Sequence, residues 1–561
     1  MKFKFNKFKK LRKYFSNIPQ YFLILFNFLT FIFFSIYLFN LQLEKINILA
    51  EEGLNFKKSI PAPRGNIYAT DKYGNLYPLA NNSLYYKVYF KNFKNLQPQE
   101  LEKIYNEIKK VFEPKVKLEK FLNSKNELLF LGEINLVKRD EIKKLNIDSL
   151  WLEQNYRRVY PYGELVSKIV GFTQDFRGIY GLEASYDDIL MGNDGILVNG
   201  KIFKVPEPGN DLITTIDINV QKKVYEATKK FLEEFKAKEA VSIVMESKSG
   251  KIIALVEIPS YDNNKINLVK DYSLFELKSL TPYEPGSVIK PFLFALGIEE
   301  NKITPETVYE DKGVVFVDGY KIYNWDKKAH GKTDIQTALN KSLNLAAIFI
   351  ENQVGDNKFL EMLERIKIEE TTGIDILNEK VGSLKSLKKP YGRKVNFYTA
   401  SFGQGITMTP LRLLVDFNIF ANEGFIVRPF LVQKIRKNTN QKIFESIIAR
   451  PFSKETIEKI NLMLQKVVEE GLGKRAKMEN YFVAGKTGTA ISYDPEIKSY
   501  NENKLIHTFV GYFPATRPQF TILTLFKEPI GGLTASQTTT KLWKEIASFL
   551  VSYYGIPPDK Y

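Results

Sequence analysis

Three short clusters of hydroxyl, amine and amide side chains in the second half of the chain have the composition of a covalent acyl-transfer site. The first is Ser287-Val288-Ile289-Lys290, which a Pro-Gly turn leads into an apolar run typical of a buried helix. Residues three apart on a helix share a face, so we expect the Lys290 amine beside the Ser287 hydroxyl. A lysine amine can act as the base for a serine only if burial or a neighbouring cation lowers its pKa.

The second cluster is Ser342-Leu343-Asn344, a polar interruption between two expected helical segments. Its hydroxyl can relay a proton to a leaving amine, and its amide can hold a peptide group of a substrate. An ordinary helix cap is the alternative interpretation of this cluster. A competing match, Ser499-Tyr500-Asn501, is expected in a polar loop.

The third cluster is Lys486-Thr487-Gly488-Thr489, which follows a strand-like run at 481–483. A cation and two hydroxyls on a strand suit a terminal carboxylate, and Gly488 would let the strand approach a ligand closely. A phosphate-binding loop is excluded because Asn480 stands where the first glycine of that motif belongs. A second S-x-x-K match, at 386–389, lies in a lysine-rich stretch and is expected to be a solvated loop.

The amino-acid composition excludes several other kinds of functional site. The 561 residues contain no cysteine, which excludes thiol nucleophiles, disulfides and cysteine zinc sites. Only His330 and His507 could serve as the base of a Ser-His-Asp triad, and any metal site would have to be rich in carboxylates. We predict neither a metal nor a cofactor.

The N-terminus has the pattern of a membrane anchor. Residues 1–20 carry seven basic residues and no acid, and they precede the apolar stretch Tyr21–Leu41. Twenty-one helical residues span roughly 31 Å, the thickness of a bilayer core. The positive-inside rule then predicts a cytoplasmic tail at 1–20, a transmembrane helix at 21–41 and the remainder outside the cytoplasmic membrane. The formal charge of +17 is partly this anchor flank, so we do not expect a nucleic-acid partner. A cleaved signal peptide is the alternative, but no A-x-A site follows.

Changes in the pattern of apolar and polar residues along the chain predict two further domains, at 42–210 and 211–555. The first contains alternating apolar and charged residues at 97–147, which indicate a small helical subdomain. The second begins with a strand at 212–216, a helix at 218–235 and two strands at 240–245 and 251–258, the pattern of an α/β domain.

The three clusters, in this order, resemble the signature of penicillin-binding proteins and class A β-lactamases. Flanking segments are similar to landmarks of the penicillin-binding family as well: Leu212–Gln221, Ser247–Asp262, Phe402–Pro410 and His507–Pro514. Pro63–Tyr68, Arg158–Pro161 and Gly181–Glu183 resemble the non-catalytic domain of its class B, monofunctional members. Two positions depart from the family pattern: Lys72 stands where the family usually has arginine, and Lys168 stands where it often has histidine.

The resemblance implies a penicillin-recognising serine transferase fold of the α/β class, with an α+β pedestal domain before it. It implies a peptidoglycan D,D-transpeptidase, in which Ser287 is the nucleophile, Lys290 its base and Ser342 the proton donor to the leaving amine. Asn344 would hold the stem-peptide amide, Lys486 would supply positive potential, and Thr487 and Thr489 would bind the terminal carboxylate beside Gly488. The backbone N–H groups of Ser287 and Thr489 would form the oxyanion hole.

The implied partners are peptidoglycan stem peptides, β-lactams and the membrane. Since 42–210 contains no Glu-Asp-x-x-Phe-x-x-His glycosyltransferase pattern, a separate polytopic glycan polymerase is also expected. The segments at 283–287 and 402–405 favour a division-type enzyme, with division-complex partners, over an elongation-type one. A D,D-carboxypeptidase, a β-lactam hydrolase and a β-lactam sensor share this fold and are competing interpretations.

Overall fold

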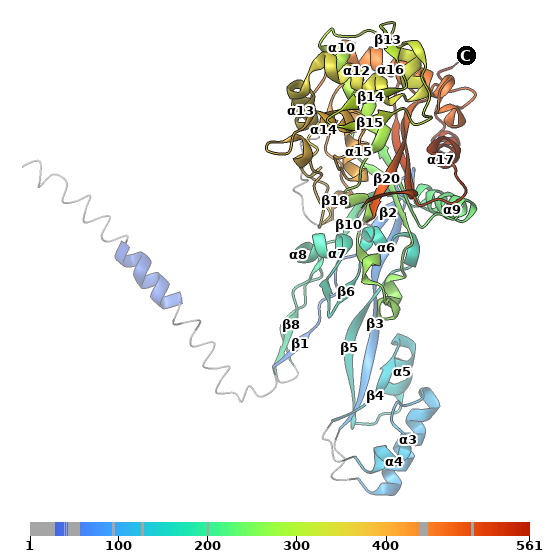
Figure 1. Cartoon of the computed structure of the whole chain (residues 1–561). Coiled ribbons are helices and arrows are strands. Elements are labelled where there is room, and N and C mark those ends of the chain that lie inside the picture. The colour runs from blue at the N-terminus through green and yellow to red at the C-terminus, as the bar shows by residue number, and fades with distance from the viewer. Residues whose placement is uncertain are drawn as a thin grey trace, which may run out of the picture. The chain divides into compact units, whose positions relative to one another are not determined.

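The computed structural model describes residues 28–38, 40, 42, 57–91, 96–124, 128–198, 201–436, 447–494 and 499–560 (Figure 1). The chain divides into two compact units, one of residues 1–62 with 193–207 and the other of 63–192 with 208–561. Residues 28–38 are helical, but none of the helices described here is long and apolar enough to cross a bilayer. The expected cytoplasmic tail and the rest of the expected span at 21–41 lie outside the described residues.

The smaller unit contains an antiparallel sheet of three strands in the order β1 (Lys57–Ile60), β8 (Gly195–Val198) and β9 (Lys201–Lys204). The Asp194 carboxylate stabilises it by accepting hydrogen bonds from the Ser59 hydroxyl at 2.7 Å and the Ala62 N–H at 2.9 Å.

The first part of the larger unit is built around one long strand, β3 (Leu76–Lys91). Along it Tyr86, Val88 and Phe90 alternate inward, where they pack beneath helices. These helices are α3 (Pro98–Val111), α4 (Leu118–Leu122) and α5 (Leu136–Lys144). Among its described residues, the expected small helical subdomain at 97–147 contains three helices, but it also contains a strand that was not expected, β4 (Leu128–Ile134), which pairs with β3. Short elements complete this part: β6 (Thr173–Gln174), β7 (Arg177–Gly178), α6 (Ser167–Val170), α7 (Gly181–Ser185) and α8 (Asp187–Leu190).

A single sheet joins this part to the second one. Its order is β18 (Val432–Ile435), β10 (Leu212–Asp217), β2 (Ile67–Thr70), β3 and β4, and β5 (Leu150–Val159) also pairs with β3. Strand β10 runs parallel to β2 and antiparallel to β18.

The second part contains a five-stranded antiparallel sheet. Its order is β12 (Ile252–Ile258), β11 (Glu239–Glu246), β22 (Phe520–Lys527), β21 (Ser499–Phe513) and β20 (Ala484–Asp494). Helices α9 (Ile218–Phe235) and α17 (Thr539–Tyr554) cover one face through a core that includes Phe231 and Trp543. The predictions of the strand at 212–216, the helix at 218–235 and the hairpin are confirmed. The expected loop at 499–501 is instead the start of β21.

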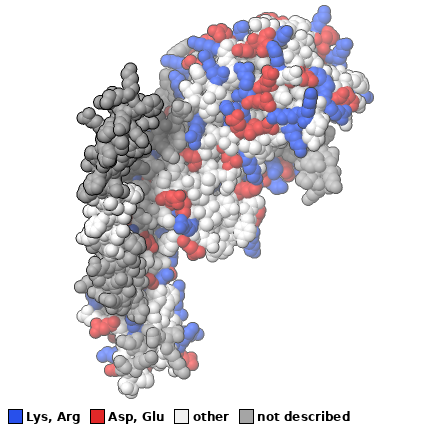
Figure 2. Space-filling view, turned by 90° about the vertical axis from the view of Figure 1, so that its left-hand side faces the viewer, with Lys and Arg blue, Asp and Glu red and all other residues white. Residues whose placement is uncertain are grey.

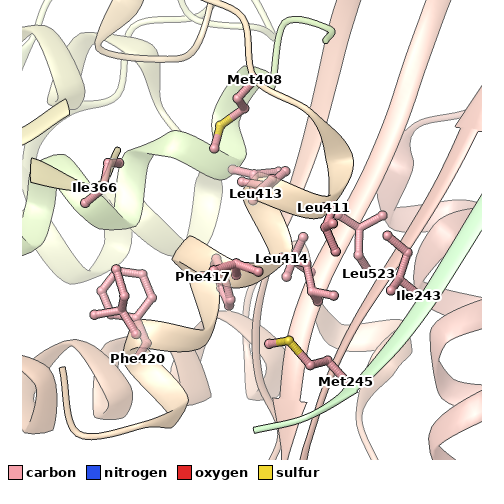
Figure 3. Close-up of a cluster of buried hydrophobic side chains, with 14 of the residues drawn as sticks. Ile243, Met245, Ile366, Met408, Leu411, Leu413, Leu414, Phe417, Phe420 and Leu523 are labelled. Carbon is pink, nitrogen blue, oxygen red and sulfur yellow. The ribbon is translucent and has the colours of Figure 1, made fainter. Parts of the chain in front are cut away.

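Helices and short hairpins cover the other face of this sheet. The helices are α10 (Lys290–Glu299), α11 (Ile335–Lys341), α12 (Asn344–Val354), α13 (Asp356–Arg365), α14 (Lys394–Ala400), α15 (Pro410–Phe417) and α16 (Lys454–Glu469). The paired strands are β13 (Val308–Asp311) with β16 (Gly331–Asp334), β14 (Val314–Val317) with β15 (Tyr320–Tyr323), and β17 (Ile426–Val427) with β19 (Ile447–Ala449). Figure 3 shows Leu411 and Leu414 of α15 close to Ile243 and Leu523 of the sheet, within one buried cluster. This packing holds the helical layer against the sheet whose edge strand, β20, carries the third cluster.

On the face drawn in Figure 2, basic and acidic side chains are mixed over the described surface. Among the residues described on that face there is no continuous basic stripe of the kind that a nucleic-acid backbone requires.

Candidate active site

Ser287 lies in a tight 3-10 turn, Gly286–Ile289, directly before α10. Gly286 has a φ of +60°, and its N–H donates to the Gly403 carbonyl at 3.1 Å. A Cβ on Gly403 would lie 2.1 Å from the Gly286 oxygen, so only glycine permits this close approach. The segment around Gly403 therefore lies directly against the turn that carries Ser287.

Lys290 is the first residue of α10, and its side chain is fully buried. Its Nζ donates to the Ser342 carbonyl at 2.7 Å and to Asn344 Oδ1 at 2.9 Å. Burial, and secondly the charge of Lys486, lower the pKa of Lys290 well below its ordinary value. A neutral amine has two hydrogens and one lone pair. In the neutral form, that lone pair can take a proton from a hydroxyl.

Ser342 connects the two buried lysines. It ends α11 in the left-handed region, with a φ of +56°. Its Oγ accepts a hydrogen bond from Lys486 Nζ at 2.8 Å and lies 3.4 Å from Lys290 Nζ. A non-glycine residue in this backbone region is uncommon, and such residues concentrate at functional sites.

The third cluster lies on β20, at the edge of the five-stranded sheet. Lys486 is fully buried, which lowers its pKa to about 7. A Cβ on Gly488 would lie 2.5 Å from Val288 Cγ2 and 2.9 Å from the Pro285 oxygen. Gly488 thus allows β20 to pack against the turn that carries Ser287.

A cavity of about 640 Å³ brings the three clusters together. Of the residues singled out from the sequence, it is lined by Ser287, Ser342, Asn344, Thr487 and Thr489. Lys290 and Lys486 are buried and reach it through Ser342, and Gly488 lies in the strand between Thr487 and Thr489. The Ser287 hydroxyl makes no hydrogen bond to any described residue; catalytic hydrogen bonds commonly tighten only when substrate binds.

Neither histidine belongs to a serine triad in the described part of the chain. His507 is buried, which lowers its pKa to about 4, and its Nδ1 lies 3.0 Å from Thr538 Oγ1. His330 instead pairs with Asp326 at 3.0 Å.

Asn324 is a site residue that the sequence analysis missed. Its Oδ1 accepts the N–H groups of Asn344 at 2.9 Å and Leu345 at 3.1 Å, at the start of α12. Its Nδ2 donates to both carboxylate oxygens of buried Asp311, at 3.0 and 2.9 Å. This network fixes the turn that carries Asn344. An isolated asparagine twenty residues earlier gave no local signal of it.

Comparison with known sequence families gives two matches. Residues 240–547, more than half of the chain, match the penicillin binding protein transpeptidase domain, and residues 59–214 match the penicillin-binding protein dimerisation domain. The chain belongs to the penicillin-binding protein transpeptidase family, and the two domains together make it a class B penicillin-binding protein. The resemblance seen in the sequence is thereby confirmed.

Individual relatives cover most of the chain. The peptidoglycan D,D-transpeptidase FtsI of Buchnera aphidicola subsp. Baizongia pistaciae is 28% identical over 89% of this chain and 88% of its own. Stage V sporulation protein D of Bacillus subtilis is 30% identical over 72% of this chain and 64% of its own. The structure of penicillin-binding protein 2X from Streptococcus thermophilus has the same fold, with a TM-score of 0.77 and 22% identity, over 89% of this chain and 81% of that one.

Proposed function

We propose that this class B penicillin-binding protein, a serine-type D,D-transpeptidase of peptidoglycan synthesis, cross-links stem peptides through an acyl-enzyme on Ser287. The observation that supports this most strongly is the pair of buried lysines joined through Ser342, beneath a cavity that Ser287 also lines. A buried amine of lowered pKa is the base that a serine nucleophile needs.

In acylation, Ser287 Oγ attacks the carbonyl of the D-Ala-D-Ala bond and its proton passes to the neutral Lys290. The N–H groups of Ser287 and Thr489 stabilise the oxyanion, each contributing roughly 3 kcal/mol. Ser342 passes a proton to the departing D-alanine. The remaining residues of the clusters bind the substrate. Asn344 holds the peptide amide, Lys486 supplies positive potential, and Thr487 and Thr489 bind the terminal carboxylate.

The N-terminal pattern supports a membrane-anchored arrangement in bacteria. Residues 1–20 remain in the cytoplasm, 21–41 cross the cytoplasmic membrane once, and the domains at 42–210 and 211–555 lie outside it. A transpeptidase without its own glycosyltransferase works with a separate polytopic glycan polymerase, and in division with other proteins of the septal complex.

A role in division is favoured by the two segments at 283–287 and 402–405. Depletion in cells distinguishes the roles, since filaments would indicate division and rounded cells would indicate elongation. A β-lactam hydrolase would differ in vitro, since steady turnover of β-lactam would support it, whereas a stable acyl-enzyme argues against it.

The test of the nucleophile is a gel with fluorescent penicillin. Ser287→Ala is expected to abolish covalent labelling while leaving the melting temperature close to that of the wild type. Ser386→Ala, in the other S-x-x-K match, is the control and should keep the label. Persistent labelling of Ser287→Ala would place the nucleophile elsewhere.

A further inference from the structure

The cavity has a wall that the acylation step does not use. It comes from β15 and the turn that follows. Besides Asn324, which caps α12, its lining residues are Tyr320, Lys321, Ile322, Tyr323, Trp325 and Lys327. This wall is separate in sequence from β20, where Thr487 and Thr489 are placed to hold the leaving end of the donor peptide.

Three aromatic side chains of this wall are unusually exposed: Tyr320 by 56%, Tyr323 by 42% and Trp325 by 54%. Single exposed aromatics need no explanation, but a group of them beside a cavity marks a binding surface. The wall is also firmly held. Trp325 Nε1 donates to the Lys341 carbonyl at 2.9 Å, and Asn344 Nδ2 donates to the Tyr323 carbonyl at 3.0 Å. Fixed aromatic rings bind ligands at little cost in conformational entropy.

The charged side chains that the structure describes along the cavity are all basic. Lys321 and Lys327 line it, and none of its described lining residues is an aspartate or a glutamate. Such a surface attracts a ligand that carries carboxylates. It also favours the neutral form of an approaching amine, because nearby positive charge disfavours an ammonium ion.

We infer that the segment Tyr320–Lys327 is the acceptor subsite, which binds the second stem peptide. This rests on the proposed function, in which a donor peptide already occupies Asn344, Thr487 and Thr489 and a second peptide must reach the same ester. Stem peptides are acidic and are attached to sugars, so the lysines bind their carboxylates and the aromatic rings pack against their apolar and sugar surfaces.

The step at this subsite balances without another reactant. The acceptor amine nitrogen forms a bond to the ester carbonyl carbon, and the bond from that carbon to Ser287 Oγ breaks. The proton that the amine loses passes through the Lys290 amine to the Ser287 oxygen, which restores the free enzyme.

The experiment separates the two half-reactions in the full-length protein. Acylation is followed with fluorescent penicillin, and acceptor use is followed with a pentapeptide donor and a disaccharide-tetrapeptide acceptor. Radiolabelled D-alanine serves as a second acceptor, too small to reach Trp325. We expect Trp325→Ala and Tyr323→Ala to slow transfer to the disaccharide-tetrapeptide at least tenfold, and to leave acylation and D-alanine exchange within about twofold. Tyr272→Ala, an exposed tyrosine that does not line this cavity, should change none of the three rates.

The two lysines of this wall provide an independent test of the acceptor subsite. Lys321→Gln combined with Lys327→Gln should raise the KM for the disaccharide-tetrapeptide and weaken its salt dependence, whereas Lys302→Gln should not. Unchanged transfer in the aromatic variants, or an equal fall of all three rates, would overturn the acceptor subsite while leaving Ser287 acylation intact. A wild-type protein that penicillin does not acylate would overturn the proposed function itself, and the subsite with it.

Discussion

Two lysine side chains, Lys290 and Lys486, lie fully buried, and every hydrogen bond that the structure describes for them goes to a carbonyl, a hydroxyl or an amide. Lysine is almost never fully buried unless it is paired with an acid. Desolvation without a counter-charge is what lowers the pKa of both amines. Burial at this site therefore favours the uncharged form of the base.

The two lysines should give acylation a bell-shaped pH profile. The second-order rate constant for β-lactam acylation is expected to fall at low pH as Lys290 becomes protonated. It should fall again above about pH 7, because Lys486 loses the positive charge that attracts the ligand carboxylate. Stopped-flow acylation across this range measures both limbs.

The basic limb can be assigned with a matched variant. Lys486→Arg keeps a cation throughout the range, so an enzyme with this change should lose the fall above pH 7, whatever its absolute rate. A basic limb that stays in place would show that another group causes it.

The same burial predicts a stability cost. Because the folded-state pKa of Lys290 lies below its unfolded value, the unfolded chain binds more protons, and the penalty grows as pH falls from about 10.4 toward the folded pKa. Lys290→Met is therefore expected to raise the melting temperature, by about 2 °C for each kcal/mol recovered, and by more at pH 6 than at pH 9. Thermal melts at both pH values test this, and a variant that melts lower at pH 6 would contradict it. Acylation should be lost.

At the scale of elements, α12 depends on a cap from outside its own sequence. Leu343 precedes the helix and offers no side-chain acceptor, whereas Asn324 accepts two of its first N–H groups. Since Asn344 lies in this first turn and holds Lys290, the cap also positions the base.

Asn324→Ala should cost about 1–2 kcal/mol of stability, the range for loss of a helix cap. We also expect at least a tenfold slower acylation and a shift of its acidic limb, because the Asn344 side chain loses its fixed place. Asn135→Ala is the matched control: it removes the cap of α5, so it should lower the melting temperature but leave acylation unchanged. Equal acylation in both variants would restrict Asn324 to a structural role.

The elements that the sequence predicted well are those with strong local signals. Helix α9 occupies 218–235 as expected because Asp217 caps it and its apolar residues recur at helical spacing. Strand β4 was missed because its short apolar run lies between two helices that dominate the local pattern. The start of β21 was missed because its polar residues are held in a strand by pairing with the end of β20, a contact absent from local sequence.

In the candidate site, too, residues with a local sequence signal were predicted and residues placed by tertiary structure were not. The three motifs in their order, together with the family resemblance, were sufficient to select Ser287, Ser342 and Lys486, and the fold places Ser342 and Lys486 in hydrogen-bond contact. Asn324 and the aromatic wall could not be found in this way. They reach the site because β13–β16 and the β14–β15 hairpin fold back over α12, which only tertiary structure determines.

At the scale of the whole molecule, a shared sheet joins the two domains of the larger unit. Strands β2 and β10 pair in parallel, so the dimerisation domain contributes strands to the sheet that continues into the transpeptidase domain. Within the dimerisation domain, Glu183 is fully buried and accepts hydrogen bonds from Arg64 at 2.6 Å and Arg158 at 2.7 Å. The shared sheet couples the stability of the two domains.

Glu183→Ala should therefore lower the stability of the transpeptidase domain although the residue lies outside it. Removing one partner leaves two buried guanidinium groups without their carboxylate, which typically costs about 3–5 kcal/mol. We expect acylation capacity and helical circular dichroism to be lost together at a reduced temperature. Two separate transitions, with acylation lost at the wild-type temperature, would contradict this coupling.

The chain has three tryptophans, and their surroundings differ sharply. Trp543 is fully buried between sheet and helix and Trp151 is half-buried on β5, whereas Trp325 stands exposed at the cavity. A soluble quencher such as acrylamide should therefore act mainly on the emission of Trp325, and a molecule seated on that indole should shield it. The protein thus carries a built-in optical reporter of cavity occupancy, which needs no added dye.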